Sequence, residues 1–462
     1  MLVRMPTHPR VLLVHPGALY GGRWAVPFVA KPALLSLFSH LRAAGVAVDV
    51  LDLQLELGNP TPDAVDEYLR RADELVAARR PELLAISCWS SLEYLGAVEV
   101  ARRAKARDPD VPVIVGGYHP TAVPEDFTGA GMPFDIVVRG EGEVALLEAV
   151  TAGLQAGGGC ALIDGSPLPL DRPALDFSAY PYVKDRPSEL AVYLSRGCPY
   201  SCAFCMEGAK GHAWRPYAVA TALDVVSRAM VLRPHVLFIQ DACFAHRVSW
   251  RREFLQGLLD LDLRLPIWVE MRADRLDGDD LELLQRLDVF LQLGVETMSP
   301  LMATRMNKAK DGARYVAAVD ATLREIVARG MLSKAFLIFH HPGETPDTAE
   351  ETVGYFERLV DEAPKSGLIV GGQPYAYFPG SHVADHLDEY ERLYGTRIAH
   401  PAWWRGPGVH HELAIDVVPS REITDPRAWV PLAARIKEVK RRTLAKMPAA
   451  AQLLFFRYYE RL

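Results

Sequence analysis

Short apolar runs alternate with helical patterns twice along this chain, and this alternation restricts the fold more than any other feature. Between residues 10 and 150 the apolar runs are RVLLVHPG, VAVDVLDLQ, ELLAISCW, VPVIVGG and FDIVVRGEGE. Strands that alternate with helices form a parallel sheet with helices on both faces. The sequence therefore predicts a doubly wound, Rossmann-like α/β domain over residues 1–150.

A second alternation covers residues 189–387 and contains six strand patterns joined by five helical ones. This is two repeats short of an eightfold barrel, so we expect a partial, TIM-like (β/α)6 barrel. Thr345 and Pro346 are predicted to be the N-cap and the first-turn proline of its fifth helix. Residues 151–188, rich in Gly, Pro, Ser and Asp, are predicted to be a linker, and residues 388–462 a helical C-terminal region.

Composition narrows the function classes. Half of the 462 residues are hydrophobic, 24% are charged and the formal net charge is −7, as in ordinary globular proteins. The sequence has no polybasic footprint for nucleic acid, no signal-peptide core at its start and no apolar stretch near the ~20 residues of a membrane span. We expect a cytoplasmic protein that binds neither nucleic acid nor membranes, whose six cysteines stay reduced.

Three of those cysteines, Cys198, Cys202 and Cys205, crowd into RGCPYSCAFCMEG at residues 196–208. They follow the first strand of the expected barrel, at the end where barrel enzymes place their active sites. A structural zinc site needs four ligands, and the next cysteine, Cys243, stands 38 residues beyond Cys205. A [4Fe-4S] cluster held by three thiolates leaves one iron open for a substrate or cofactor. The spacing therefore favours an open cluster.

The pattern Cys-x3-Cys-x-aromatic-Cys, with Phe204 as the aromatic residue, resembles the radical S-adenosylmethionine (SAM) enzymes. The resemblance implies a [4Fe-4S] cluster on the three cysteines and SAM on its fourth iron, cleaved reductively to a 5′-deoxyadenosyl radical that abstracts hydrogen. LFIQDACF, VEMRAD, LGVETMSP and FLIFHHPGET resemble the second to fifth strands of that family, and YAYFPGS the sixth. The implied SAM contacts are Phe204, Gln240, Asp241, Arg272, Glu296 and Ile338.

The N-terminal segments VIVGGYHPTAVPE and DIVVRGEGE are similar to the cobalamin-binding domain that precedes the barrel in one branch of the family. Paired glycines would let a flat ligand approach the backbone, or they simply make a tight turn. The Asp-x-His-x-x-Gly motif that supplies a cobalt ligand elsewhere is absent after VLLVHPG, so the domain either binds cobalamin without that histidine or has lost the cofactor. The implied corrin-side residues are Ser87, Trp89, Gly116, Gly117, His119, Gly140 and Glu141.

The layout of the chain resembles the radical dehydratases of aminoglycoside antibiotic biosynthesis. This predicts dehydration or deoxygenation of a small polar substrate such as an aminosugar, helped by an acid and a base. One alternative is a cobalamin-dependent C-methyltransferase, and another is an iron-sulfur or cobalamin sensor. Flavodoxin, ferredoxin or a partner reductase would supply electrons. The candidate catalytic residues are Glu270, His340 and Tyr377, with His341 and Tyr375 beside them.

Overall fold

The computed structural model divides the chain into two compact units. Unit 1 comprises residues 1–186 and 402–414, and unit 2 comprises residues 187–401 and 415–462. The structure describes residues 9–20, 31–153, 159–171, 175–184, 189–211, 213–262, 266–406, 413–449, 451–453 and 455.

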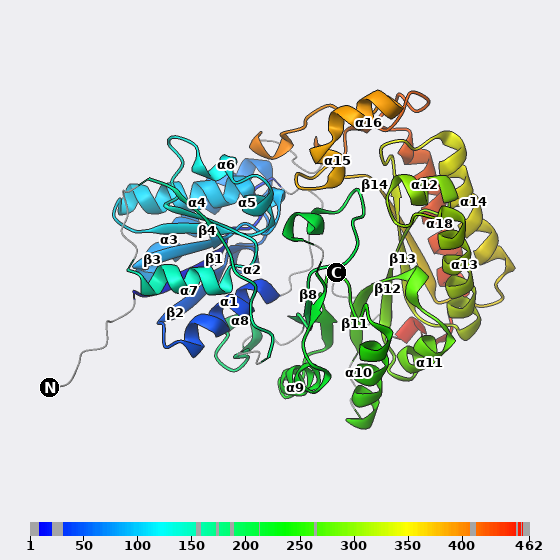
Figure 1. Ribbon diagram of the computed structural model, residues 1–462, viewed down its shortest axis with the longest axis horizontal. Helices are drawn as coiled ribbons and strands as arrows, with labels where there is room; N and C mark the ends of the chain where they lie inside the picture. Colours follow the sequence, from blue (N-terminus) through cyan, green and yellow to red (C-terminus); the bar gives the residue numbers. More distant parts are fainter. Residues whose placement is uncertain are drawn as a thin grey trace. The chain divides into compact units, whose positions relative to one another are not determined.

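Unit 1 is built on one six-stranded parallel sheet in the order β2-β1-β3-β4-β5-β6. Helices α1 (Pro32–Ala43) and α7 (Glu143–Thr151) pack together on one side, and α3 (Val65–Arg79) and α4 (Tyr94–Arg107) on the other (Figure 1). The doubly wound fold is thereby confirmed. Its strands are β1 (Val11–His15), β2 (Val48–Asp52), β3 (Leu83–Ser87), β4 (Val113–Gly116), β5 (Ile136–Arg139) and β6 (Ala161–Asp164).

The segment predicted to be a linker, residues 151–188, departs from that prediction because β6 lies within it. β6 pairs in parallel with β5 and adds the sixth strand of unit 1. Its side chains are mostly exposed, and its apolar run, Ala161 to Ile163, is only three residues long, too short to identify a strand among the surrounding Gly, Pro and Asp residues. Tyr180 and Tyr182, further along the same segment, are buried against unit 1, where the Tyr182 hydroxyl accepts a 2.8 Å hydrogen bond from the Asp52 amide.

Unit 2 contains the predicted partial barrel, a parallel sheet in the order β14-β13-β12-β11-β10-β7. The fifth helix begins as expected, with the Thr345 side chain accepting from the Thr348 amide and Pro346 in the first turn. The strands are β7 (Glu189–Val192), β10 (Val236–Ile239), β11 (Ile267–Arg272), β12 (Phe290–Glu296), β13 (Ser333–Phe339) and β14 (Leu368–Pro374). The connecting helices are α9 (Val219–Met230), α10 (Val248–Asp260), α11 (Gly278–Arg286), α13 (Gly312–Arg329) and α14 (Pro346–Glu362).

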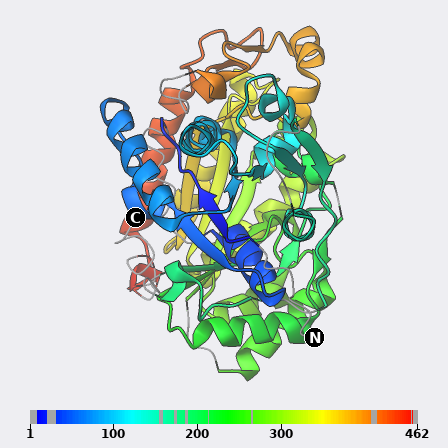
Figure 2. The same cartoon turned by 90° about the vertical axis from the view of Figure 1, so that its left-hand side faces the viewer.

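Residues 388–462, predicted as one helical region, serve both units. Helix α18 (Trp429–Ala445) packs on β14 and α14, and Figure 1 and Figure 2 show it beside the yellow strands. After α18, Met447 and Ala451 join Val236, Phe290 and Ile369 in an apolar cluster at the amino ends of the strands. This cluster closes the lower end of the barrel interior, so the chemistry of unit 2 lies at the opposite, carboxyl end. Residues 402–414, in contrast, belong to unit 1.

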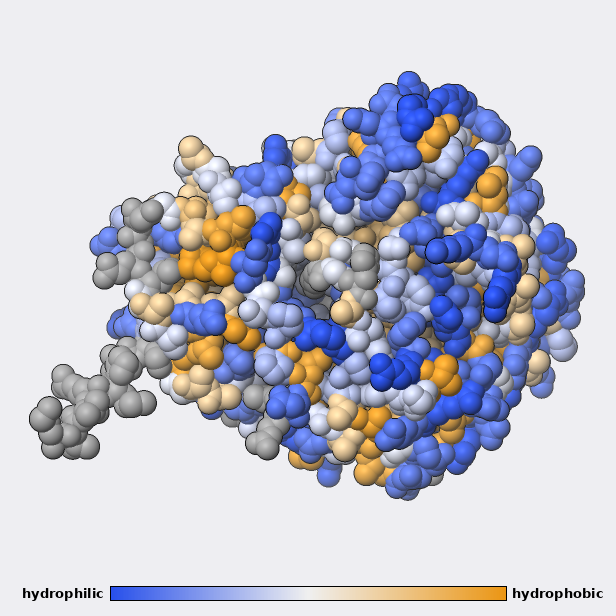
Figure 3. All heavy atoms as spheres, in the orientation of Figure 1, coloured by the Kyte–Doolittle hydropathy of each residue, from blue (hydrophilic) through white to orange (hydrophobic). Residues whose placement is uncertain are grey.

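Polar residues cover much of the face of unit 2 shown in Figure 3, with hydrophobic residues scattered between them. Within the described ranges, no helix combines the length and the apolar character needed to cross a bilayer.

Candidate functional site

The three clustered cysteines lie in a loop between β8 (Ser195–Arg196) and the 3-10 helix η3 (Met206–Lys210). Gly197 opens this loop with φ of +74°, and a Cβ there would lie 2.2 Å from the Ala213 carbonyl oxygen. Only glycine fits such a position. The turn brings Cys198, Cys202 and Cys205 onto the carboxyl side of the barrel, as the sequence predicts.

Backbone bonds from distant segments hold the cysteine loop. The Ala203 amide donates to the Met306 carbonyl at 2.9 Å, and the Val383 amide donates to the Ala203 carbonyl at 3.1 Å. The Asn307 side-chain amide donates to the Ser201 carbonyl at 2.7 Å. The loop is therefore fixed by the segments after β12 and after β14, which keeps its thiols in place without a bound group.

The three thiols differ in their electrostatic surroundings. A hydrogen bond from the Cys243 thiol lowers the pKa of Cys198 to about 7. Burial raises the pKa of Cys202, against the opposing effect of Lys308 and Arg272, and burial raises the pKa of Cys205 to about 12. The three thiols influence one another electrostatically, so they share one site.

Among the residues that the structure describes, no three His, Cys, Asp or Glu side chains converge to hold a single metal ion. A structural zinc site needs four such ligands around one point. A cluster of four irons instead takes each thiolate on a different iron, so its ligands need not converge on one point. Two of the sulfurs also accept hydrogen bonds, Cys202 from Arg272 at 3.7 Å and Cys205 from the Glu207 amide at 3.5 Å. These thiols fit an iron-sulfur cluster.

Asp241, a predicted SAM contact, is almost completely buried beneath the loop. One carboxylate oxygen accepts from the Leu194 amide at 2.8 Å and the other from the Ser195 hydroxyl at 2.6 Å. Burial raises the pKa of Asp241 to about 6. Trp214 extends the network by donating 3.0 Å bonds to the Ser195 hydroxyl and the Cys243 carbonyl. Asp241 therefore anchors the start of the loop, whereas Gln240 beside it is partly exposed.

Arg272 and Glu296, also predicted SAM contacts, are joined by a residue that the sequence did not single out. Lys308 is buried, and its ammonium donates to Glu296 Oε1 at 3.1 Å and to the Gly294 carbonyl at 3.1 Å. The backbone carbonyl of Lys308 accepts from Arg272 at 2.7 Å. A Cβ at Gly294 would lie 2.8 Å from Glu296 Oε1, so glycine leaves the space that the ion pair fills. No strand or motif pattern marks Lys308, which only the folded chain brings here.

Glu270, a predicted catalytic residue, lies on β11 two residues after Trp268, which packs against the apolar cluster, so the two side chains lie on the same face of the sheet. The strand register places it beside Gln292, and Gln292 beside Lys334. Glu270 is exposed, yet protein surrounds its carboxyl, and the resulting desolvation raises its pKa to about 7 against the opposing effect of Lys334. A carboxyl in such a position can take up or release a proton near neutral pH. Ile338, partly exposed, lies near the carboxyl end of β13, which β12 separates from β11.

The other two catalytic candidates lie at the ends of β13 and β14. His340 has φ of +61°, is fully buried, and its amide donates to Glu344 Oε2 at 2.5 Å. Burial lowers the pKa of His340 to about 4 and raises that of Glu344 to about 8. Tyr377 is buried too. Burial also lowers the pKa of His341 to about 4, and its ring contacts Phe204 and Tyr375 with centroids 6.2 and 5.2 Å away.

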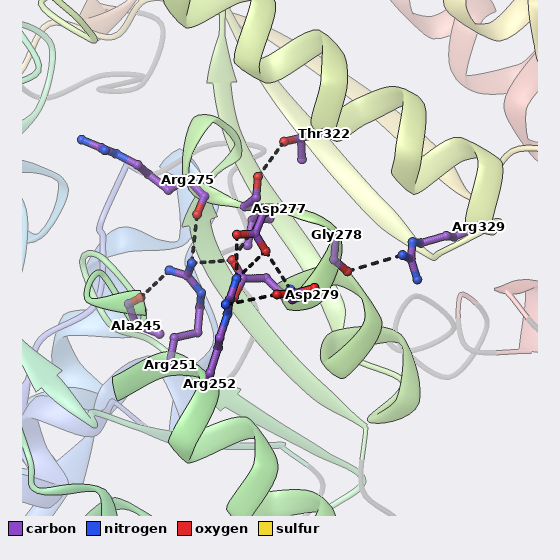
Figure 4. Close-up of polar contacts among 11 residues, drawn as sticks. Ala245, Arg251, Arg252, Arg275, Asp277, Gly278, Asp279, Thr322 and Arg329 are labelled. Carbon is purple, nitrogen blue, oxygen red and sulfur yellow. Dashed lines mark hydrogen bonds and ion pairs between the residues drawn. The ribbon is translucent and has the colours of Figure 1, made fainter. Parts of the chain in front are cut away.

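A buried ion pair ties together the loops after β10 and β11 (Figure 4). The Arg251 guanidinium contacts Asp280 at 2.5 Å, and both side chains are fully buried. Arg251 also donates to the Ala245 carbonyl at 2.9 Å and the Arg275 carbonyl at 3.0 Å. Cys243 lies between β10 and α10, and Arg272 is the last residue of β11, so Arg251 indirectly supports the surroundings of the cysteines.

In unit 1 the carboxyl edge of the sheet carries small residues at the ends of β3 and β4 and directly after β5, whereas β1 and β2 end in His15 and Asp52. Gly117 has φ of +129°, and a Cβ there would lie 2.1 Å from the Cys88 carbonyl, so close packing of two strand ends requires this glycine. Gly116 and Gly140 meet nothing closer than 3.5 Å, and Ser87 is only partly buried. Such an edge, with few large side chains, fits a flat ring. Glu141 is occupied in accepting from the Leu168 amide at 2.8 Å.

His119, a predicted corrin-side residue, is completely buried, and both of its ring nitrogens have partners. Nδ1 lies 2.7 Å from the Ser91 hydroxyl and Nε2 lies 3.1 Å from Asp126 Oδ2. Asp126 also accepts from the Trp404 indole at 2.6 Å and from Arg405. Burial lowers the pKa of His119, so the ring is neutral. The arrangement ties the 402–414 segment to unit 1, a contact that no local sequence signal predicts.

The two halves of the sequence match two known families. Residues 28–150 match the B12 binding domain and residues 192–356 match the radical SAM superfamily. The chain therefore carries a radical SAM domain preceded by an N-terminal B12-binding domain. Radical SAM enzymes use a [4Fe-4S] cluster and SAM, so the open-cluster interpretation of the cysteine loop agrees with the family.

Similar proteins include several enzymes. The chain is 25% identical to the anaerobic magnesium-protoporphyrin IX monomethyl ester cyclase of Rubrivivax gelatinosus over 74% of this chain and 64% of the relative. It is 26% identical to the hopanoid C-3 methylase of Methylococcus capsulatus over 63% of this chain and 57% of the relative. The chain thus spans less than two thirds of either protein.

Among solved structures, the radical SAM methyltransferase TsrM of Kitasatospora setae aligns with a TM-score of 0.66 and 17% identity, over 93% of this chain and 89% of TsrM. That structure holds tryptophan and a SAM analogue, and a second structure of TsrM holds cobalamin and a [4Fe-4S] cluster. At this identity the likeness establishes a shared fold.

Proposed function

We propose that this protein is a cobalamin-dependent radical SAM methyltransferase that acts on a small polar molecule. The observation that carries the proposal is the B12 binding domain at residues 28–150 ahead of a radical SAM domain at residues 192–356. The chain is similar in sequence both to a methylase and to a cyclase. The dehydration expected from the chain layout has no counterpart among these relatives, so methyl transfer takes its place.

The cysteines, Glu270 and the two buried histidines have different roles in the proposed reaction. Cys198, Cys202 and Cys205 hold the cluster, which supplies the electron that cleaves SAM, while cobalamin at the glycine edge of unit 1 carries the methyl group. Glu270 exchanges a proton with the substrate inside the barrel, since its pKa of about 7 suits that task at neutral pH. The buried, neutral His340 and His341 shape the pocket and exclude water. An electron donor of the flavodoxin or ferredoxin type reduces the cluster.

Anaerobic expression with and without added hydroxocobalamin tests this function. Purified protein should carry cobalamin, measured by its corrin absorbance and by cobalt per chain. With SAM and a strong reductant it should release both S-adenosylhomocysteine, the product of methyl donation, and 5′-deoxyadenosine, the product of reductive cleavage. The absence of cobalamin together with 5′-deoxyadenosine as the only SAM product would overturn methyl transfer and favour dehydration. The absence of both products would favour a sensor.

Glu270→Gln tests whether Glu270 exchanges a proton with the substrate. Gln292→Glu, at the paired position on β12, is the variant for comparison. Glu270→Gln removes the titrating group at nearly constant volume, so turnover should fall at least ~100-fold, the lower end of typical acid-base contributions. Its iron, sulfide and cobalamin contents should equal those of the wild type. A Glu270→Gln enzyme with unchanged turnover and pH profile would remove Glu270 from the mechanism.

A further inference from the structure

A buried arginine touches the sulfur of one of the three cysteines. Arg272 ends β11, its side chain is 9% exposed, and its Nη1 donates to Cys202 Sγ at 3.7 Å. The guanidinium and the Cys202 thiol are therefore in direct contact.

The rest of the guanidinium is fixed by partners of its own. Nε and Nη2 donate to the two oxygens of Asp274 at 2.9 and 3.1 Å, and Nη2 also donates to the Lys308 carbonyl at 2.7 Å. The Tyr200 ring lies under the group, 4.1 Å from its central carbon. A forked, stacked arginine of this kind has one orientation, in which only the Nη1 edge remains directed at the sulfur.

These partners leave Arg272 poorly suited to bind SAM, the role that the sequence predicts for it. Four of its five N–H donors are used by Asp274, Lys308 and Cys202. A carboxylate ligand would have to displace Asp274 or the thiol to obtain a bidentate contact. The geometry points instead to an action on Cys202.

We propose that Arg272 is a positioning residue for the iron-sulfur cluster, whose hydrogen bond to the Cys202 thiolate makes the cluster easier to reduce. This rests on the proposed function, in which Cys202 is a cluster ligand. Hydrogen bonds to cluster sulfurs and nearby positive charge stabilise the reduced, more negative state, and so raise its reduction potential. Lys308 supports the arrangement twice, through its carbonyl to Arg272 and its ammonium to Glu296.

The matched control is Arg275, three residues along the same loop. Its side chain is 52% exposed, lies 3.7 Å from Asp274 and has its charge 5.5 Å from the Tyr200 ring. Arg275→Gln therefore removes one positive charge from the same neighbourhood, whereas Arg272→Gln removes the hydrogen bond to sulfur as well. Arg272→Lys keeps the charge, but a single ammonium cannot reach both Asp274 and Cys202.

The experiment compares full-length wild type, Arg272→Gln, Arg272→Lys and Arg275→Gln after anaerobic reconstitution with iron and sulfide. Iron and sulfide per chain are measured first. The midpoint potential follows from a reductive titration monitored by electron paramagnetic resonance, and resonance Raman spectra of the oxidised clusters report the terminal Fe–S stretches. We expect a more negative midpoint and Fe–S stretches at higher frequency in Arg272→Gln, a smaller change in Arg272→Lys, and wild-type values in Arg275→Gln.

The outcomes separate this inference from the function beneath it. Wild-type protein that takes up no iron and sulfide would overturn the cluster assignment itself. Arg272→Gln protein with full iron content, an unchanged midpoint and unchanged stretches would overturn the role of Arg272 alone. If Arg272→Gln does not retain iron, Arg272→Lys becomes the deciding variant. A wild-type midpoint potential and wild-type Fe–S stretches in Arg272→Lys would then overturn the proposal.

Discussion

The two sheets of this protein share an architecture but differ at their carboxyl edges. Both have six parallel strands, yet the edge of unit 1 offers Gly116, Gly140 and a neutral His119 whose nitrogens are both bonded. The edge of unit 2 gathers sulfur and charge, with Cys202, Arg272 and their neighbours in contact. The comparison teaches that parallel strands only provide an edge, and that the loops beyond it determine the chemistry.

The largest effect is expected from removing a cysteine of the cluster loop, which tests whether the iron-sulfur chemistry belongs to unit 2 alone. Cys202→Ala should lose the cluster, seen as loss of iron and sulfide, and should reduce 5′-deoxyadenosine formation to background. Cys160→Ala is the control, because Cys160 belongs to unit 1 and its thiol approaches only the Phe127 carbonyl, at 3.8 Å. Full activity in Cys202→Ala, or an equal loss in Cys160→Ala, would contradict the assignment.

A second prediction concerns the hydrogen bonds that Asp126 makes with His119 and Trp404 in unit 1. Asp126→Ala removes the acceptor for both His119 and the Trp404 indole, two buried donors. Each unsatisfied buried group costs about 1–3 kcal/mol, so we expect a loss of roughly 2–6 kcal/mol from the unfolding free energy of unit 1, measured by urea denaturation.

Glu125→Ala is the control for Asp126, since Glu125 is exposed and should change stability by less than about 0.5 kcal/mol. The iron content of Asp126→Ala protein should equal that of the wild type. An unchanged urea midpoint would show that the His119 and Trp404 bonds do not hold the edge together. Loss of iron would show that the two edges depend on each other.

The sequence shows the fold and the cysteines, but not the contacts between distant loops. Strand and helix periodicity is local, which is why both sheets and the Thr345 cap are predictable. Lys308 meets Glu296 next to a register shift of β12 between Gly294 and Glu296, which no local pattern predicts. Strand β6 escapes prediction because its apolar run is only three residues long and lies in a segment rich in Gly, Pro and Asp. Asp241 has the residue type of a ligand contact, and only the structure reveals that both oxygens bind the loop.

Burial of Glu344, in the segment after β13, gives the edge of unit 2 a pH response. Burial raises the pKa of Glu344 to about 8, so the folded protein holds a proton there that the unfolded chain releases near pH 4.3. Because the folded state binds more protons, this group makes stability fall as pH rises through that window, by at most about 1.4 kcal/mol per pH unit.

Glu344→Gln removes this titration and keeps an oxygen to accept the His340 amide. The variant should therefore gain stability relative to the wild type as the pH is raised from about 5 to 9. Urea denaturation of both proteins at several pH values measures that difference, with the exposed Glu351→Gln as a control on the same side of the barrel. A difference that stays constant with pH would mean that Glu344 is ionised in the folded state.

The smallest expected effect comes from removing a single hydroxyl in unit 2, that of Tyr315. Tyr315 on α13 is buried and donates to the Val295 carbonyl at 2.7 Å, next to the bulge that positions Glu296. Tyr315→Phe keeps the ring near Arg272 and Lys308, and Val295 still accepts from the Thr297 amide, so the change removes only the hydroxyl, with its 2.7 Å bond and a longer 3.5 Å bond to the Gly294 carbonyl. We expect a loss of about 1 kcal/mol in urea denaturation, with the cluster potential unchanged. A shifted potential in Tyr315→Phe protein would mean that the hydroxyl, through the Glu296–Lys308 pair, acts on the cluster alongside Arg272.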